Sequence, residues 1–341
     1  MKTFAQKHPV LTFLLVTFAW TWLFWLAAIP FRGQTLLVMT IVLIGGYGPA
    51  IGGILTLGLR SGLSPDLSPR KMVTLGIAAA VIFALLTLRY LAGNIPNYDT
   101  LAENLTLSAP IVLAALAASL VGGWVISSAV SRNADIRARM ASILPWRLPV
   151  GWTILALLFY PALILAAWGL ALLLGTGVEY PALWGRPALE VLPLYALTFG
   201  LTALAQGGNE EPGWRGLLQP ELQKRFNPLV AALIVSVFWS LWHLPLYLNG
   251  FYPGDLLGGM LGGAVFRVLL AIFLAWFYNR SGGNLFLVIF LHTCFNVMVN
   301  FLPVSDLWML VLWLVVVIIV VVKDKMWRKL PESSLAQGAI L

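Results

Sequence analysis

The stretch DLWMLVLWLVVVIIVVV, residues 306–322, decides the fold class, because after Asp306 it contains no charged or polar aliphatic residue. A helix that spans a bilayer needs about 17 to 25 predominantly apolar residues. We expect ten such stretches, all helical, because runs this long and this uniformly apolar do not fit the alternating strands of a membrane barrel. They are residues 10–31, 35–59, 72–92, 111–131, 149–175, 188–206, 228–249, 259–279, 284–303 and 306–322.

The composition of the whole chain points the same way. Of its 341 residues, 60% are hydrophobic and 10% are charged, whereas a soluble domain has about 25% charged residues, so an ordinary cytosolic protein is excluded. A single cysteine, Cys294, excludes a disulfide framework and a cysteine-cluster metal site. We therefore predict an all-α, polytopic transmembrane helix bundle of about ten helices, one integral membrane domain over residues 1–341.

The net charge of +8 comes from basic residues scattered between apolar runs, which favours contact with the lipid bilayer and no nucleic-acid partner. If the N-terminus is cytoplasmic and the stretches alternate, 17 of the 21 basic residues fall on the inner side. Arg32 and Arg186 fall outside, and Arg89 and Arg267 lie inside apolar stretches. This asymmetry predicts a multi-pass protein with both termini cytoplasmic. The inner set is Lys2, Lys7, Arg60, Arg70, Lys71, Arg132, Arg137, Arg139, Arg147, Arg215, Lys224, Arg225, Arg280, Lys323, Lys325, Arg328 and Lys329.

Strongly polar residues cluster in the second half of the chain. Two of the three histidines, His243 and His292, lie within the seventh and ninth apolar stretches, and Glu210, Glu211 and Arg215 lie between the sixth and the seventh. Ionisable groups inside a membrane are costly and usually face one another or water. Each motif also has a structural interpretation on its own: a packed histidine, a helix-terminus glutamate pair, or an exposed ion pair worth about 0.3–0.5 kcal/mol.

Together these residue types suit the hydrolysis of an amide. Repulsion between Glu210 and Glu211 favours a protonated carboxyl, and Arg215 opposes that effect, so that one carboxylate can take a proton from water. His243 can hold that water. His292 and Asn296, one helical turn apart, can donate hydrogen bonds to a developing oxyanion.

Other mechanisms are weaker or stay open. Cys294 lies about 200° around the helix from His292, which argues against a cysteine–histidine pair. No Walker loop, H-E-x-x-H or G-x-S-x-G motif occurs. Two histidines and a glutamate are ligand types of catalytic zinc sites, so a divalent metal such as zinc remains open, although the preferred mechanism requires no cofactor.

At these residues the chain resembles the CPBP (Abi) intramembrane protease family, which includes type II CAAX prenyl endopeptidases and relatives of the lysostaphin resistance protein. The family motif E-E-x-x-x-R is matched by Glu210 to Arg215, the aromatic residue four before a histidine by Trp239 and His243, and H-x-x-x-N by His292 and Asn296. Trp239 stands where the family commonly has phenylalanine.

The resemblance implies roles for these residues. Glu210 would activate water with His243, Glu211 and Arg215 would support the site, and His292 with Asn296 would form the oxyanion hole. The substrate would be a peptide or membrane protein. The motif-bearing segment is residues 188–305; since the family core has about eight helices, residues 1–70 would be additional N-terminal helices.

Two alternatives to a protease stay open at this stage. Some members of the family act in bacteriocin immunity or as membrane regulators, so a non-catalytic protein could retain the motifs as structure. A transporter with Glu210 as its proton site is disfavoured by the absence of an internal repeat.

The predicted helix boundaries also contain a conflict. They place Glu210 near the cytoplasmic end of its stretch but His243 past the middle of its own. A shared site requires that one of these two boundaries be wrong.

Overall fold

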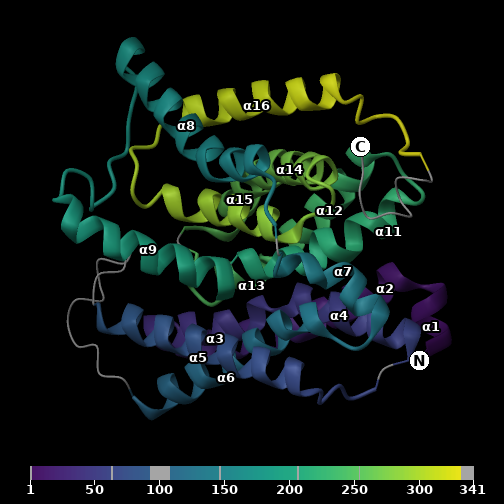
Figure 1. Cartoon of the computed structure of the whole chain (residues 1–341). Coiled ribbons are helices and arrows are strands. Elements are labelled where there is room, and N and C mark those ends of the chain that lie inside the picture. The colour runs from purple at the N-terminus through teal and green to yellow at the C-terminus, as the bar shows by residue number, and fades with distance from the viewer. Residues whose placement is uncertain are drawn as a thin grey trace.

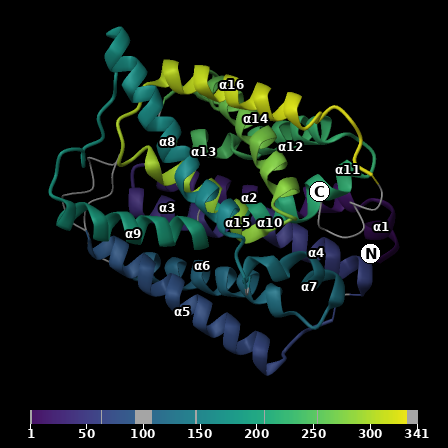
Figure 2. The ribbon, with the colours of Figure 1, turned by 45° about the horizontal axis from the view of Figure 1, so that its top comes forward.

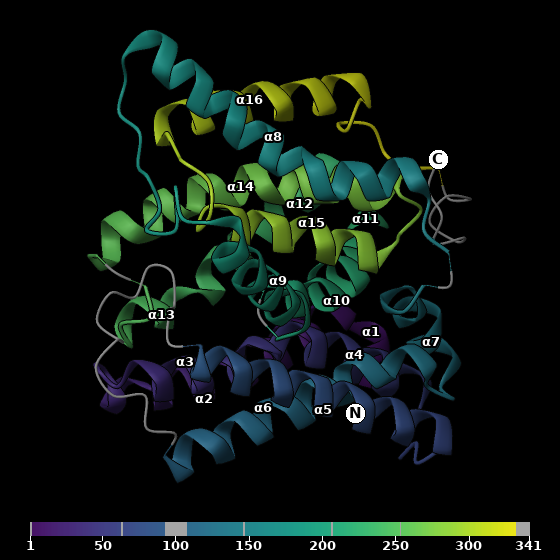
Figure 3. The ribbon, with the colours of Figure 1, turned by 60° about the vertical axis from the view of Figure 1, so that its left-hand side comes forward.

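The computed structural model describes a bundle of helices. Among the described residues there is no strand, and β-type pairing is limited to one isolated bridge between Glu179 and Val304. In Figures 1 and 3, α9 and α10 lie between the N-terminal helices and a second group formed by α8, α14, α15 and α16. The described residues are 2–62, 64–92, 108–145, 147–205, 207–252 and 254–331.

The helices follow one another with short connections. Their bounds are α1 Lys2–Lys7, α2 Pro9–Ala27, α3 Thr35–Gly46, α4 Gly48–Ser61, α5 Pro69–Leu91, α6 Ala109–Ser127, α7 Ala134–Met140, α8 Val150–Leu174, α9 Ala188–Ala205, α10 Glu211–Gly213, α11 Gln219–Gln223, α12 Pro228–Trp242, α13 Leu244–Leu248, α14 Leu256–Arg280, α15 Leu285–Met298 and α16 Asp306–Lys323.

The all-α membrane bundle predicted from the sequence is confirmed. Within the described residues, nine helical segments are long and apolar enough to cross a membrane. The ninth predicted stretch is helical but shorter, because α15 has 14 residues, or about 21 Å against a hydrocarbon core of about 30 Å. Its apolar residues Leu285, Leu287 and Val288 are buried, so the hydrophobicity of α15 reflects packing inside the bundle.

Helix starts near the polar residues are fixed by side-chain caps. The Oδ1 atom of Asn227 accepts a hydrogen bond from the Val230 N–H at 2.9 Å, and Asn284 caps Leu287 in the same way at 3.1 Å. A proline at residue 228, in the first turn of α12, lacks the N–H that a helix start leaves unpaired. The seventh stretch therefore begins where the sequence predicts.

The boundary of the sixth stretch is wrong. After α9 ends at Ala205, helical turns resume at Gly208 and continue to Gln223, with a π-helical turn over Trp214–Leu218. Residues 207–223 are all buried, and a buried backbone in a membrane must satisfy its own hydrogen bonds. Glu210 therefore lies in the middle of a long buried segment, which removes the conflict with His243.

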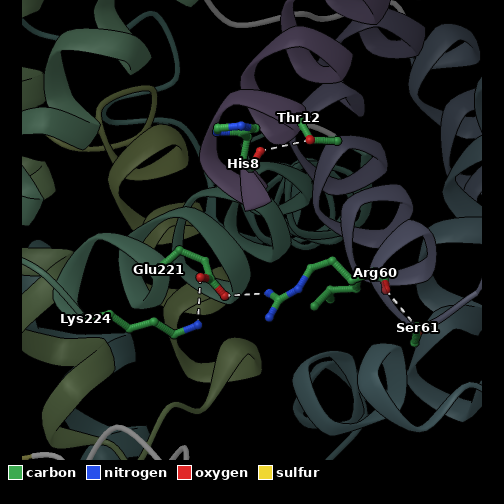
Figure 4. A network of polar contacts seen from close by, with 7 residues as sticks. His8, Thr12, Arg60, Ser61, Glu221 and Lys224 are labelled. Carbon is green, nitrogen blue, oxygen red and sulfur yellow. Dashed lines mark hydrogen bonds and ion pairs between the residues drawn. The ribbon is translucent and has the colours of Figure 1, made fainter. Parts of the chain in front are cut away.

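The two ends of the bundle carry different sets of residues. The start of α1 and the end of α16 lie at the same end in Figures 1 and 2. Arg60, at the end of α4, contacts Glu221 of α11 there (Figure 4), with 2.7 Å between Nη1 and Oε1. The bundle thus brings the described parts of both terminal regions to one side; that this side is cytoplasmic stays a prediction.

Candidate active site

Glu210 is held by a tryptophan from α12. The indole Nε1 of Trp239 donates a hydrogen bond to Glu210 Oε2 at 2.6 Å, and both side chains are buried. Trp239 lies eleven residues after Pro228, about 16 Å along the helix. Because the hydrocarbon core is about 30 Å thick, this carboxylate sits near the middle of the membrane.

Glu211 serves two partners with one oxygen. Its Oε1 lies 2.6 Å from His292 Nδ1 and 3.1 Å from Arg215 Nη1. All three side chains are at most 3% exposed, so the ion pair with Arg215 is buried rather than surface-exposed. The Arg215 guanidinium also lies over the Trp239 ring, 4.9 Å from its centroid, and so joins the two carboxylate groups of the motif into one cluster.

The hydrogen bonds of the two histidines fix where each ring is available for chemistry. His243 Nδ1 lies 2.7 Å from the carbonyl oxygen of Trp239. A carbonyl can only accept, so Nδ1 carries the proton and Nε2 of the neutral ring keeps a lone pair. His292 uses Nδ1 toward Glu211, so its Nε2 donates when the ring carries a second proton, a state that the Glu211 carboxylate stabilises.

A glycine gives access to His292 and Asn296. A Cβ atom placed on Gly207 would lie 2.1 Å from Asn296 Nδ2 and 3.6 Å from His292 Nε2. Gly207 also has a φ of +70°, a region that side chains disfavour. The backbone at Gly207 therefore approaches the two groups predicted to stabilise an oxyanion, at the point where α9 ends.

Trp239 connects the remaining histidine to this cluster. Its ring centroid is 5.4 Å from that of His292 and 6.1 Å from that of His243. The structure therefore groups Glu210, Glu211, Arg215, His292 and Asn296 around Gly207 and Trp239, with His243 on the far side of the indole. The six predicted site residues are listed here with their elements: Glu210 after Gly207, Glu211 on α10, Arg215 in the π-helical turn, His243 between α12 and α13, and His292 and Asn296 on α15.

Two residues of the cluster were not predicted in these positions. Trp239 was noted only as the aromatic member of a motif, and its hydrogen bond depends on the register of α12 against the turns after α9. Gly207 stands in the polar run Gly207 to Gly216, and its glycine identity before a glutamate pair was the available signal.

The N-terminal helices pack directly against the motif. A Cβ on Gly213 would lie 2.1 Å from the carbonyl oxygen of Pro49 in α4, and Trp242 Nε1 donates to Thr21 Oγ1 of α2 at 2.8 Å. Whether residues 1–70 are an addition to a smaller family core stays a prediction, but here they form one wall of the site.

The possible zinc site lacks a preformed ligand set. Within the described residues, no three His, Cys, Asp or Glu side chains are grouped closely enough to hold a metal ion. His243 Nδ1 and His292 Nδ1 are both engaged in hydrogen bonds with protein groups. The side chains as arranged do not fit a three-ligand metal centre, and we derive no step through one.

Comparison with known proteins covers the same part of the chain. Residues 192–298 match the family described as type II CAAX prenyl endopeptidase Rce1-like. The motif-bearing segment is similar to type II CAAX prenyl endopeptidases. A curated protein, CAAX prenyl protease 2 of Methanococcus maripaludis, is 29% identical over 102 residues, which are 28% of this chain and 38% of that protein.

These matches confirm the resemblance predicted from the motifs. All six predicted site residues fall within residues 192–298. The matched region covers well under two thirds of the length of the curated relative, and residues 1–191 lie outside it.

Proposed function

We propose that this protein is an intramembrane endopeptidase that hydrolyses a peptide bond with a glutamate-activated water. The observation that carries the proposal is the placement of the buried Glu210 carboxylate, fixed by the 2.6 Å hydrogen bond from Trp239 beside the His292 ring. A buried carboxylate without its own cation-pairing oxygen is suited to proton transfer, and the similarity to CAAX prenyl proteases supports peptide hydrolysis.

The proton moves between water and Glu210. The Nε2 lone pair of His243 accepts a hydrogen bond from the water, and Glu210 removes the other proton as the water oxygen attacks the carbonyl carbon. Collapse of the tetrahedral intermediate breaks the C–N bond, and Glu210 returns the proton to the departing amine. No acyl-enzyme forms, so each turnover restores the site.

The negative charge that develops on the carbonyl oxygen meets two donors. His292 Nε2–H and Asn296 Nδ2–H converge near Gly207, and Glu211 holds the His292 ring through Nδ1. Removing one such donor typically lowers kcat by about 10²–10³-fold. Arg215 acts as a positioning residue, because it fixes Glu211 rather than the reacting atoms.

The proposal is tested with purified full-length protein in lipid nanodiscs. We expect endoproteolytic cleavage of peptides or membrane proteins, with fragments identified by mass spectrometry, and the same rate after dialysis against a chelator. Activity lost on chelation and restored by zinc would contradict the metal-independent mechanism. Absence of cleavage across prenylated and unprenylated peptides would instead favour the non-catalytic immunity or scaffold alternative.

A further inference from the structure

A second buried charge lies close to this site. Arg267 of α14 is 9% exposed, and its Nη1 atom has no hydrogen-bond partner among the described residues. Within the same residues it forms no ion pair; its Nη2 atom lies 3.5 Å from the Tyr247 hydroxyl. Arg267 is eleven residues from the start of α14, about 16 Å along that helix. A buried, unpaired guanidinium at this depth is energetically costly unless it has a partner.

The surface of α14 is shaped to hold this side chain. The run Gly258-Gly259-Met260-Leu261-Gly262-Gly263 precedes it. A Cβ on Gly263 would lie 2.8 Å from Arg267 Nη1, and a Cβ on Gly259 would lie 2.4 Å from the Tyr247 ring. The Tyr247 hydroxyl donates to the carbonyl oxygen of Gly259 at 2.8 Å. Two glycines one turn apart thus seat the tyrosine ring and the guanidinium side by side.

The seated guanidinium is linked to His243. The rings of His243 and Tyr252 are stacked with centroids 6.0 Å apart, and Tyr252 contacts Tyr247 at 5.1 Å. The positive charge of Arg267 also interacts electrostatically with His243. A group bound to Arg267 therefore lies beside the residue that holds the water in the proposed reaction.

We propose that Arg267 is a specificity-determining residue that binds the C-terminal carboxylate of the peptide substrate, with Tyr247 as its positioning residue. This inference rests on the proposed function. A planar guanidinium pairs with a carboxylate through two parallel hydrogen bonds, which supplies the partner that Nη1 lacks. A chain end is the source to which we commit, because a carboxylate on a mid-chain side chain would require the peptide to continue past a residue that is 91% buried.

The test compares one peptide with a free C-terminus and the same peptide with an amidated C-terminus, in nanodiscs of neutral lipid. We expect wild-type kcat/KM to be about 10- to 100-fold higher for the acid, the range that a charged hydrogen-bonded contact supplies. Arg267→Gln brings the acid-to-amide ratio close to one. Arg89→Gln, which removes another buried arginine from α5, retains the wild-type ratio.

Binding to the Glu210→Gln variant provides a readout that does not depend on turnover, and we expect the acid peptide to bind about 10- to 100-fold more tightly than the amide. Equal cleavage and equal binding of acid and amide would overturn the inference while leaving the proposed function intact. No cleavage of either peptide, with acid-selective binding retained, would overturn the proposed function alone.

Two further outcomes would reassign the subsite and so contradict the proposal. An acid preference that disappears when anionic lipid is added would assign Arg267 to a lipid phosphate. Equal rates for the acid peptide and for an amidated peptide with an internal acidic residue would assign it to a side-chain carboxylate. If Arg267→Gln does not fold, the acid–amide comparison on the wild-type protein still decides the question.

Discussion

At the scale of single residues, two adjacent glutamates have different surroundings. Glu211 shares one oxygen between His292 and Arg215, whereas Glu210 accepts a hydrogen bond from the neutral Trp239 indole. The sequence identifies these residue types and their spacing, but it does not tell which carboxylate pairs with the cations. That depends on the π-helical turn over Trp214–Leu218, which sets the direction of Arg215.

The first prediction concerns the buried ion pair. Glu211→Gln removes the negative charge and leaves Arg215 buried and unpaired, so the protein loses about 3–5 kcal/mol of stability. Thermal unfolding in detergent measures this loss. The matched control is Glu221→Gln, whose partners Arg60 and Lys224 are 30% and 45% exposed and can be solvated by water. An equal loss in both variants would show that burial of Arg215 does not set the cost.

At the scale of elements, the segment after α9 is held by close backbone contacts with α4. The ideal Cβ position of Gly213 is 2.1 Å from the Pro49 carbonyl oxygen, and that of Gly53 is 3.1 Å from the Pro212 carbonyl oxygen. The existence of ten apolar helical segments was predictable from hydropathy. The continuation of helical turns from Gly208 to Gln223 was not, because polar and glycine-rich sequence normally indicates a loop, and only burial against other helices makes helix the favoured conformation here.

The second prediction tests this contact. Gly213→Ala forces α4 and the motif apart and costs about 1–3 kcal/mol, with a matching fall in any peptidase activity. Gly216→Ala is the matched control, since its new Cβ would meet its nearest neighbours at 3.4 Å, an ordinary van der Waals contact. Unfolding midpoints of both variants measure the difference. A wild-type midpoint for Gly213→Ala would contradict the close packing of α4 on α10.

At the scale of the whole molecule, polar contacts at one end join helices that are distant in sequence. Arg60 links α4 to α11 (Figure 4), and Arg280 at the end of α14 pairs with Asp324 after α16, with 2.6 Å between Nε and Oδ2 and 2.6 Å between Nη2 and Oδ1. The distribution of basic residues predicted which residues share an end. The pairings themselves could not be predicted, because they depend on which helices are neighbours in the bundle.

The third prediction concerns acid stability. The hydrogen bonds from Arg280 lower the pKa of Asp324 below its ordinary value. Because the folded-state pKa is the lower one, the pair stabilises the fold above the ordinary aspartate pKa of about 3.9, and that stability is lost as the pH falls through the folded-state pKa. Arg280 is 37% exposed, so the contribution is at most about 1 kcal/mol.

Unfolding midpoints measured from about pH 6 down to about pH 3 check this. The difference between wild type and Asp324→Asn should be largest at the upper end of this range and shrink toward the lower end. A difference that stays constant with pH would contradict the role of the charged pair.

The central claim is that Glu210 is the proton acceptor of the reaction, and the single-turnover rate of one peptide substrate tests it most directly. Glu210→Gln should lower that rate by at least about 10²-fold, since it removes general-base catalysis while keeping the size of the side chain. Glu190→Gln, an exposed glutamate in the first turn of α9, should keep the wild-type rate. Equal rates for wild type and Glu210→Gln would contradict the account.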